Sequence, residues 1–303
     1  MSSKNVVEVI GLKKSYRSPM TRKRVEALKG VSFAVQAGAI TGFLGANGAG
    51  KTTSIKCLFE LAFADEGEFI FFGKKGLSNE AKSKIGFLPE RPYFYDYLTG
   101  REFLKFYGQI SGRIPRDELE SRTTALLERV GLAQAGVRPL RGYSKGMLQR
   151  IGIAQALIHR PEFIVLDEPM TGLDPDGRHE VSEIIREVAS QGTAVFFSSH
   201  HLSDAESLCE RLVILKKGEL VYEGRTDTLM TQVDSSWRVA FHRMGTEAGK
   251  VEETFVKSIE ELQTQIDCLR REGCEIRDVG TKKVSLEEIF IKMAFDPKTE
   301  VQR

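Results

Sequence analysis

Residues 45–53 read GANGAGKTT, which fits the phosphate-binding pattern G-x-x-x-x-G-K-[ST]. The apolar stretch 39–44 before this loop predicts a buried strand, and a helix is expected to begin after Gly50. Glycines let the backbone curl its N–H groups around phosphate oxygens, because no Cβ stands in the way. We expect Lys51 to neutralise the β- and γ-phosphates and Thr52 to bind Mg²⁺ beside the positive helix N-terminus. The predicted nucleotide-binding residues of this loop are Gly45, Asn47, Gly48, Gly50, Lys51, Thr52 and Thr53.

A second apolar run, FIVL at residues 163–166, ends in the paired carboxylates of Asp167 and Glu168. The run predicts a buried strand whose carboxyl end presents both acids. We expect Asp167 to hold Mg²⁺ through water and Glu168 to polarise the water that attacks the phosphate. The alternative, a strand that ends in a solvated D-E-P turn, is less favoured once the phosphate loop is granted.

A third apolar strand is predicted at residues 194–198, and it leads to His200. The carboxyl ends of neighbouring strands in an open parallel sheet share one edge, so His200 is expected to converge with Lys51 and the two acids on one ligand. A lone histidine after a strand is ordinarily structural. Its order and spacing relative to the other two motifs favour the functional interpretation.

Strands and helices alternate after the phosphate loop, which predicts a mostly parallel core sheet covered by helices. Segments of mixed polarity before residue 80 predict an antiparallel β lobe with glycine turns. The apolar spacing becomes helical after Gly100, and we expect a helical insert over about residues 95–160. The fold class is therefore α/β.

The composition shifts near Gly224, after which the pattern predicts a strand at 237–241 and helices at 259–272 and 285–294. These segments read as a small αβ unit. We therefore expect two domains, which cover residues 1–225 and residues 226–303.

Composition and charge exclude several other classes. The 303 residues include 44 basic and 42 acidic side chains, and a net charge of +2 gives no electrostatic footprint of a nucleic-acid binder. The four cysteines form no C-x-x-C pair, so a structural metal site is not expected. The amino terminus lacks the apolar stretch of a secretory signal, and no run approaches the roughly 20 apolar residues that cross a bilayer. We expect a cytoplasmic protein.

Residues 141–150 read RGYSKGMLQR and open an amphipathic helix. This segment resembles the signature motif of ABC ATPases, and the order of all the motifs is that of the family. Ser144 and Gly146 match the serine and the second glycine of the family's L-S-G-G-Q, whereas Tyr143, Lys145 and Met147 depart from it. The Y-S-K-G-M variant resembles the form frequent in ATP-binding subunits of type-two ABC exporters.

Other motifs add to the resemblance, which covers about residues 5–225. The segment TGLDP at 171–175 is similar to the D-loop and contains Asp174. Tyr16 resembles the aromatic residue that stacks on adenine, and His200 resembles the switch histidine. Residues 284–293, VSLEEIFIKM, are more weakly similar to the closing helix of many exporter subunits.

The resemblance implies an ATPase with the P-loop NTPase fold of ABC type, with ATP and Mg²⁺ as cofactors and Glu168 as general base. It also implies a head-to-tail dimer, in which Ser144 and Gly146 of one subunit close over the γ-phosphate held by Lys51 of the other. The expected partner is a separate membrane-spanning permease, and the expected location is the cytoplasmic face of the membrane. The expected function is ATP-driven transport, with export as the direction.

Glu90 departs from the family pattern, which usually has glutamine at this lid position. A carboxylate can still reach Mg²⁺, so we predict Glu90 as a metal ligand with altered metal dependence. The aromatic cluster directly after it, Tyr93, Phe94, Tyr95 and Tyr97, is our candidate groove for a cytoplasmic helix of the permease. Ordinary core packing of the helical insert is an equal alternative for this cluster.

The same ATPase fold leaves other functions open. A soluble nucleic-acid ABC protein would show two ATPase domains or a long coiled-coil insertion, and this chain has neither pattern. An iron-sulfur assembly ATPase has this size, but the Y-S-K-G-M variant and the appended domain argue against it. A non-hydrolysing binding module would need the loss of Glu168 or His200, and both are present.

Overall fold

The computed structural model describes residues 4–17, 24–232, 237–243, 251–281 and 285–295. The chain divides into two compact units, Met1–Arg225 and Thr226–Arg303. Residues 296–303 of the predicted C-terminal domain and Val284 of the predicted closing helix lie outside the described residues.

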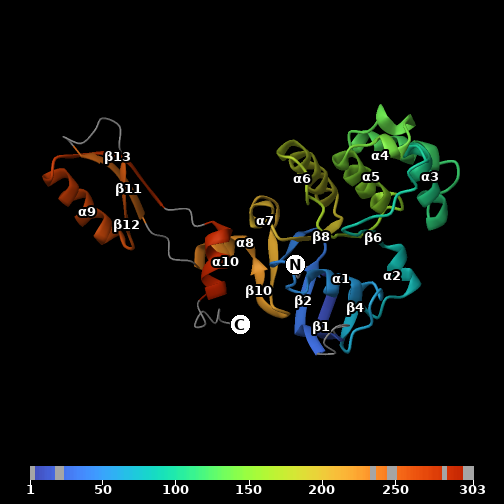
Figure 1. Ribbon diagram of the computed structural model, residues 1–303, viewed down its shortest axis with the longest axis horizontal. Coiled ribbons are helices and arrows are strands. Elements are labelled where there is room, and N and C mark those ends of the chain that lie inside the picture. The colour runs from blue at the N-terminus through green and yellow to red at the C-terminus, as the bar shows by residue number, and fades with distance from the viewer. Residues whose placement is uncertain (1–3, 18–23, 233–236, 244–250, 282–284, 296–303) are drawn as a thin grey trace. The chain divides into compact units, whose positions relative to one another are not determined.

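A six-stranded sheet in the order β10-β9-β3-β8-β7-β6 forms the centre of the first unit (Figure 1). Its strands are β3 (Ile40–Leu44), β6 (Ile85–Leu88), β7 (Phe163–Leu166), β8 (Ala194–Ser199), β9 (Arg211–Lys216) and β10 (Glu219–Arg225). The neighbours from β9 to β6 are parallel, and β10 pairs antiparallel with β9. Every residue of β3, β7 and β8 is buried, which explains why their sequences are almost continuously apolar.

An antiparallel sheet in the order β2-β1-β4-β5 forms the predicted β lobe. Its strands are β1 (Asn5–Arg17), β2 (Arg24–Gln36), β4 (Glu66–Phe71) and β5 (Lys74–Lys75). Aromatic rings join this lobe to the central sheet, since Phe33 of β2 lies 5.3 Å from Phe43 of β3 and 5.6 Å from Phe196 of β8, measured between ring centroids. The predicted combination of a mostly parallel core and an antiparallel lobe is confirmed.

The helices of the first unit include the predicted helical insert. They are α1 (Lys51–Leu58), α2 (Asn79–Ser83), α3 (Gly100–Ser111), α4 (Leu119–Arg129), α5 (Lys145–Leu157), α6 (Pro175–Ser190) and α7 (Leu202–Leu208), with short 3₁₀ turns η1 (Ala135–Val137) and η2 (Leu140–Gly142). A capping box between Thr99 and Glu102 fixes the start of α3. Figure 1 shows α3, α4 and α5 gathered into one group, which is the insert.

The described residues of the second unit form a three-stranded antiparallel sheet, β12-β11-β13, and three helices. Its elements are α8 (Thr226–Gln232), β11 (Trp237–Arg243), β12 (Glu252–Val256), α9 (Ile259–Arg271), β13 (Cys274–Thr281) and α10 (Leu286–Phe295). Leu262 and Leu269 of α9 pack with Val239 and Phe241 of β11. The sequence predicted β11, α9 and α10, but β12, β13 and α8 were not predicted.

Candidate functional site

One cavity of about 480 Å³ gathers most of the predicted site residues from distant parts of the chain. It is lined by Tyr16, Ala27, Ala46, Asn47, Gly48, Gly50, Lys51, Thr52, Thr53, Glu90, Glu168, Thr171 and His200. These residues come from the end of β1, the start of β2, the phosphate loop (residues 45–53), and the segments that follow β6, β7 and β8. Because these three strands and β3 are parallel neighbours, their carboxyl ends meet at one edge of the sheet.

The phosphate loop needs glycine where the backbone is most crowded. A Cβ on Gly45 would lie 2.5 Å from the carbonyl oxygen of Leu215, and Gly50 has a φ of 109° directly before α1. The loop is also held from outside, since the N–H of Gly218 donates to the carbonyl of Ala49 at 3.0 Å. Lys51 is only 5% exposed, and its Nζ donates to the carbonyl oxygen of Gly45 at 2.6 Å. The phosphate loop therefore buries its own lysine and fixes it through a backbone carbonyl of the same loop.

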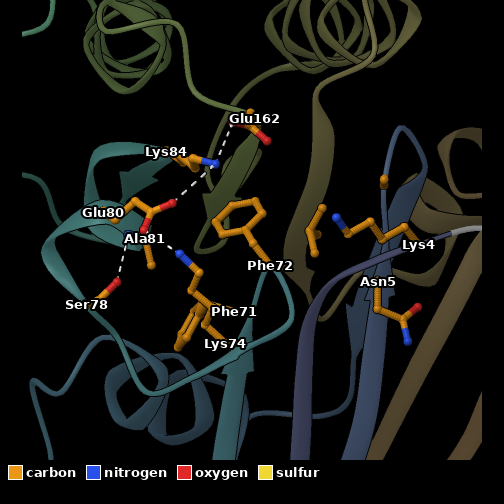
Figure 2. A pocket seen from close by; sticks show the side chains of 12 residues that line it. Lys4, Asn5, Phe71, Phe72, Lys74, Ser78, Glu80, Ala81, Lys84 and Glu162 are labelled. Atoms are coloured by element: carbon orange, nitrogen blue, oxygen red, sulfur yellow. Dashed lines mark hydrogen bonds and ion pairs between the residues drawn. The ribbon is translucent and has the colours of Figure 1, made fainter.

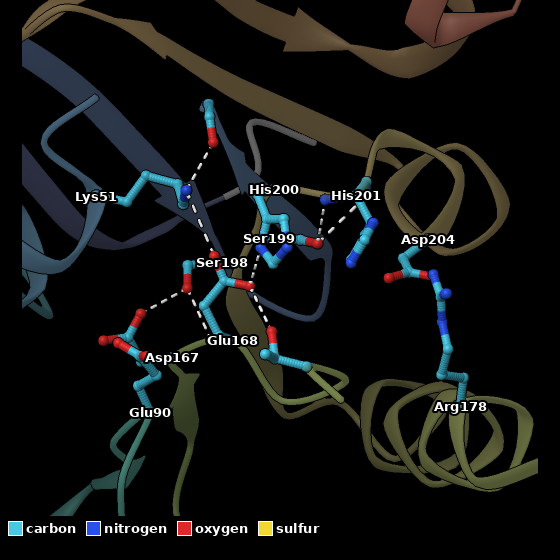
Figure 3. Close-up of polar contacts among 12 residues, drawn as sticks. Lys51, Glu90, Asp167, Glu168, Arg178, Ser198, Ser199, His200, His201 and Asp204 are labelled. Carbon is cyan, nitrogen blue, oxygen red and sulfur yellow. Dashed lines mark hydrogen bonds and ion pairs between the residues drawn. The ribbon is translucent and has the colours of Figure 1, made fainter. Parts of the chain in front are cut away.

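Glu168 lies between Lys51 of the phosphate loop and His200 (Figure 3). Its Oε1 lies 3.4 Å from Nζ of Lys51, and its Oε2 lies 2.7 Å from Nδ1 of His200. The hydroxyl of Thr171 donates to Oε2 at 2.9 Å. Glu168 also has a φ of 52°, an uncommon conformation for a residue with a side chain and one that is found at functional sites. The convergence expected from the parallel strands is present in the structure.

Asp167 and Glu168 are linked through one hydroxyl. Ser198 of β8 donates to Oδ1 of Asp167 at 2.6 Å and accepts the backbone N–H of Glu168 at 2.8 Å. Asp167 is 3% exposed, and burial raises its pKa; the charges of Glu90 and Glu168 raise it further, against the hydrogen bond from Ser198. The protein alone therefore places too little positive charge near Asp167 to stabilise its ionised form.

Glu168 has the opposite electrostatic balance. Its burial raises the pKa, but the hydrogen bonds from Thr171 and His200 and the charge of Lys51 together hold the pKa below its ordinary value. Glu168 is therefore ionised at neutral pH, which is the state that a proton acceptor needs.

The donor set of this region fits a hard divalent cation. Glu90 follows β6 and acts electrostatically on Asp167, while the hydroxyl-bearing Thr52 lines the same cavity. Within the described ranges, no group of three or more His, Cys, Asp or Glu side chains is arranged to hold a metal ion alone. Mg²⁺ usually takes one or two protein oxygens together with waters and substrate phosphates, so the excess of negative charge around Asp167 fits this ion.

Tyr16 lies at the cavity from the end of β1, with 43% of its surface exposed. Its ring is therefore accessible from the cavity for stacking against a planar group. Asn47, Gly48 and Thr53 also line the cavity, whereas Gly45 contributes its carbonyl group to Lys51.

Besides Gly45, three predicted nucleotide-binding residues do not line this cavity. Ser144 caps the start of α5 by accepting the N–H of Met147 at 3.3 Å, and Gly146 follows in the first turn. Asp174 caps α6 by accepting the N–H of Gly177 at 2.9 Å. The structure thus places these residues at two helix starts and does not bring them to the cavity of their own chain.

Ser198 and Thr171 were missed in the sequence. Serine and threonine are common, and Thr171 does not directly follow an apolar strand. One signal was present for Ser198, because it directly follows the apolar run 194–197 as Asp167 follows the run 163–166.

A second cavity of about 170 Å³ shows the contrast with a ligand site (Figure 2). Lys84 lies 3.3 Å from Glu162 and 3.9 Å from Glu80, and Lys74 lies 2.7 Å from Glu80. Glu162 precedes β7, so this cavity is at the opposite end of that strand from Glu168. Four of its charged side chains already pair with each other, namely Lys74, Glu80, Lys84 and Glu162.

Comparisons with known proteins identify one family. The family model described as ABC transporter matches residues 28–171. An uncharacterized ABC transporter ATP-binding protein of Synechocystis is 40% identical over 300 residues, which cover 95% of this chain and 84% of the relative. A daunorubicin resistance ATP-binding protein of Streptomyces coeruleorubidus is 30% identical over 293 residues, which cover 90% of this chain and 92% of the relative.

A solved structure supports the fold. A dimeric ATP-binding cassette in a post-hydrolysis state with ADP and Pi has a TM-score of 0.65 and 24% identity, and the match covers 73% of this chain and 98% of the other. Among the residues that our structure describes, none of the helices has the length and apolar character needed to cross a bilayer. The similarity over almost the whole chain, together with the phosphate loop and its converging acids, shows that the chain belongs to the family of ABC transporter ATP-binding proteins and is an ATPase.

Proposed function

We propose that this ATPase drives export through a separate membrane-spanning partner, on the cytoplasmic face of the membrane. The position of Glu168 between Lys51 and His200 in a single cavity is the observation that carries the ATP-hydrolysing part of this proposal. The export direction is supported by the Y-S-K-G-M variant and by the name of the daunorubicin resistance relative. The transported molecule would contact the partner rather than this chain.

In this proposal Glu168 is the general base. Lys51 now divides its contacts between the carbonyl of Gly45 and Oε1 of Glu168. A triphosphate offers a stronger anionic acceptor, so Lys51 turns to the phosphates and leaves Oε1 free to take a proton from the attacking water. His200 and Thr171 keep Oε2 in place meanwhile, which fixes the direction in which the free oxygen points. Tyr16 stacks on the adenine.

Thr52, Asp167 and Glu90 would hold Mg²⁺, which would neutralise negative charge on the phosphates. The raised pKa of Asp167 supports this assignment, because the acid is buried with two like charges near it. Glu90→Gln should shift the Mg²⁺ concentration needed for half-maximal ATPase activity. Unchanged Mg²⁺ dependence and rate in both Glu90→Gln and Glu90→Ala would exclude a metal role for Glu90.

Ser144 and Gly146 serve the partner subunit of a head-to-tail dimer in this proposal. Their place at the start of α5, outside the cavity of their own chain, supports it. The hydroxyl and the first N–H groups of a helix form a donor set suited to a γ-phosphate. Asp174, at the start of α6, would lie at the same boundary between subunits.

The contact with the membrane partner is proposed at Tyr93, Tyr95 and Tyr97. Tyr93 is 81% exposed and Tyr97 is 66% exposed, and the ring of Tyr95 lies between theirs at 5.8 Å and 6.2 Å. Phe94 instead packs 5.5 Å from the buried ring of Phe103, so this member of the predicted cluster belongs to the core of the insert. Exposed tyrosines of this kind favour an interface.

The interface is tested with Tyr95→Ala, which should keep the ATPase rate of the isolated chain but lose the membrane protein that co-purifies with the wild type. Val137→Ala removes another exposed apolar side chain of the insert and should retain the partner. Retention of the partner by Tyr95→Ala would rule out this groove.

The function is tested most simply by paired substitutions at the two ends of β7. Glu168→Gln should lower kcat for ATP by about a thousandfold while ATP binding persists, because it removes the base and keeps the shape. Glu162→Gln makes the same change at the amino end of the strand and should leave kcat unaltered. Equal rates for both variants would refute the proposed role of Glu168.

A further inference from the structure

The end of β1 that carries Tyr16 is supported by a partner strand on one side only. On the β2 side the pairing runs through Tyr16, which is opposite Val25. On the β4 side the pairing stops at Lys13, which is opposite Glu66. The last residues of β1 thus extend beyond β4, although they carry the ring that the proposed function assigns to the base.

Beyond the end of β4, the carboxylate of Asp65 is the hydrogen-bond acceptor for β1. Its Oδ2 accepts the backbone N–H of Ser15 at 2.8 Å and the hydroxyl of Ser15 at 2.5 Å. The backbone N–H of Asp65 also donates to the carbonyl of Lys13 at 2.8 Å. A side chain therefore supplies the acceptor that a further residue of β4 would have supplied, and it fixes the backbone directly before Tyr16.

The same carboxylate places a cation beside the Tyr16 ring. Oδ1 of Asp65 lies 3.2 Å from Nζ of Lys14, and that Nζ lies 5.4 Å from the centroid of the ring. Arg24 of β2 donates to the hydroxyl of Ser15 at 2.7 Å and completes the cluster. The hydrogen bonds from Ser15 and Lys14 lower the pKa of Asp65 to about 2, so the carboxylate is ionised at every pH at which the enzyme works.

We propose that Asp65 is a positioning residue for the adenine base: it fixes the end of β1 and holds Lys14 against one face of Tyr16, which leaves the cavity-facing side of the ring for the base. Tyr16 lines the cavity and Lys14 does not, which supports this division of the two faces. The inference rests on the proposed stacking of Tyr16 on the base. Asp65 itself does not line the cavity.

The test separates base binding from phosphate binding. KM and kcat for ATP are measured for Asp65→Ala, Asp65→Asn and Tyr16→Ala, and binding of ATP and of tripolyphosphate is measured by calorimetry. Base stacking on an aromatic ring predicts that Tyr16→Ala weakens ATP binding roughly tenfold. Asp65→Ala should raise KM about threefold to tenfold with kcat unchanged, and Asp65→Asn should fall between it and the wild type. Binding of tripolyphosphate, which has no base, should be the same in all variants.

Glu66→Ala is the matched control. Glu66 is the residue after Asp65, and its carboxylate lies 2.7 Å from Nζ of Lys13 on β1. The Glu66→Ala variant should leave KM unaltered. In the Tyr16→Ala background, Asp65→Ala should add nothing further to KM. The proposal is overturned if Asp65→Ala leaves KM unchanged, weakens ATP and tripolyphosphate equally, or adds its full effect to Tyr16→Ala. If Tyr16→Ala itself leaves ATP binding intact, the stacking role fails and the positioning role fails with it.

Discussion

Two neighbouring carboxylates at the end of β7 have opposite environments. Asp167 is buried beside other acids, and its pKa is raised; Glu168 is surrounded by Lys51, His200 and Thr171, and its pKa is lowered. Such a separation of pKa values is typical of sites where two acids have different tasks. It agrees with a metal-binding role for Asp167 and a proton-accepting role for Glu168.

Asp167→Asn should make the nucleotide-free protein more stable while it abolishes ATPase activity. A raised folded-state pKa means that the ionised acid costs stability, and this cost grows as pH rises from the unfolded-state pKa near 4 through the folded-state pKa. We expect an increase in Tm of roughly 2 °C at pH 7, measured by calorimetry, that disappears below about pH 4. A lower Tm for Asp167→Asn at pH 7 would contradict this electrostatic picture.

The sequence predicted the site residues that follow apolar strands, because a polar side chain at the end of a buried run is a distinctive pattern. Ser198 also follows an apolar run, but its contact was not predictable, since it depends on β7 and β8 being adjacent, and adjacency is a property of the sheet order. The role of Asp65 was not predictable either, because its contact with Ser15 joins residues 50 positions apart. Long-range hydrogen bonds of single side chains leave no local signal.

At the scale of elements, the helix that begins after Ser144 has two functions that can be separated. Ser144 stabilises α5 within its own chain by capping it, and we propose that it also contacts the γ-phosphate of the partner subunit. Both functions use the same hydroxyl group, so removal of the side chain alone does not distinguish them.

Ser144→Asp should keep the stability of α5 but abolish ATP hydrolysis, because aspartate is a good N-cap and its charge repels a γ-phosphate. Ser144→Ala should instead lower the free energy of unfolding by about 1 kcal/mol and keep part of the activity. Chemical denaturation and ATPase assays on the two variants test this. Full activity of Ser144→Asp would show that the start of α5 lies away from any phosphate.

Elements with continuous apolar runs, such as β3, β7 and β8, were predictable because burial on both faces removes polar residues from their sequences. The strands of the second unit were harder to predict. β12 and β13 carry charged residues at exposed positions, such as Glu253 and Arg277, and their apolar residues are too few to give a clear alternation. β12 and β13 form strands because they pair with β11, and the intrinsic strand propensity of their residues does not account for them.

At the scale of the whole molecule, we propose that the site is one half of a larger enclosure formed by two subunits. The cavity is lined by most of the phosphate loop together with Glu168 and His200, whereas Ser144, Gly146 and Asp174 lie outside it at two helix starts. A single chain therefore surrounds a nucleotide incompletely, and the proposed head-to-tail dimer supplies the missing donors. Hydrolysis would remove the γ-phosphate that holds the two subunits together, which would couple the ATPase cycle to opening and closing.

The most direct measurement is sedimentation of the Glu168→Gln variant with and without Mg²⁺ and ATP, combined with a count of the nucleotides retained. We predict a monomer without nucleotide and a stable dimer with two ATP molecules when ATP is present, because binding persists while the base is missing. The double variant Glu168→Gln with Ser144→Asp should remain monomeric under the same conditions. A Glu168→Gln protein that stays monomeric with ATP bound, or that hydrolyses ATP at the wild-type rate, would contradict the account.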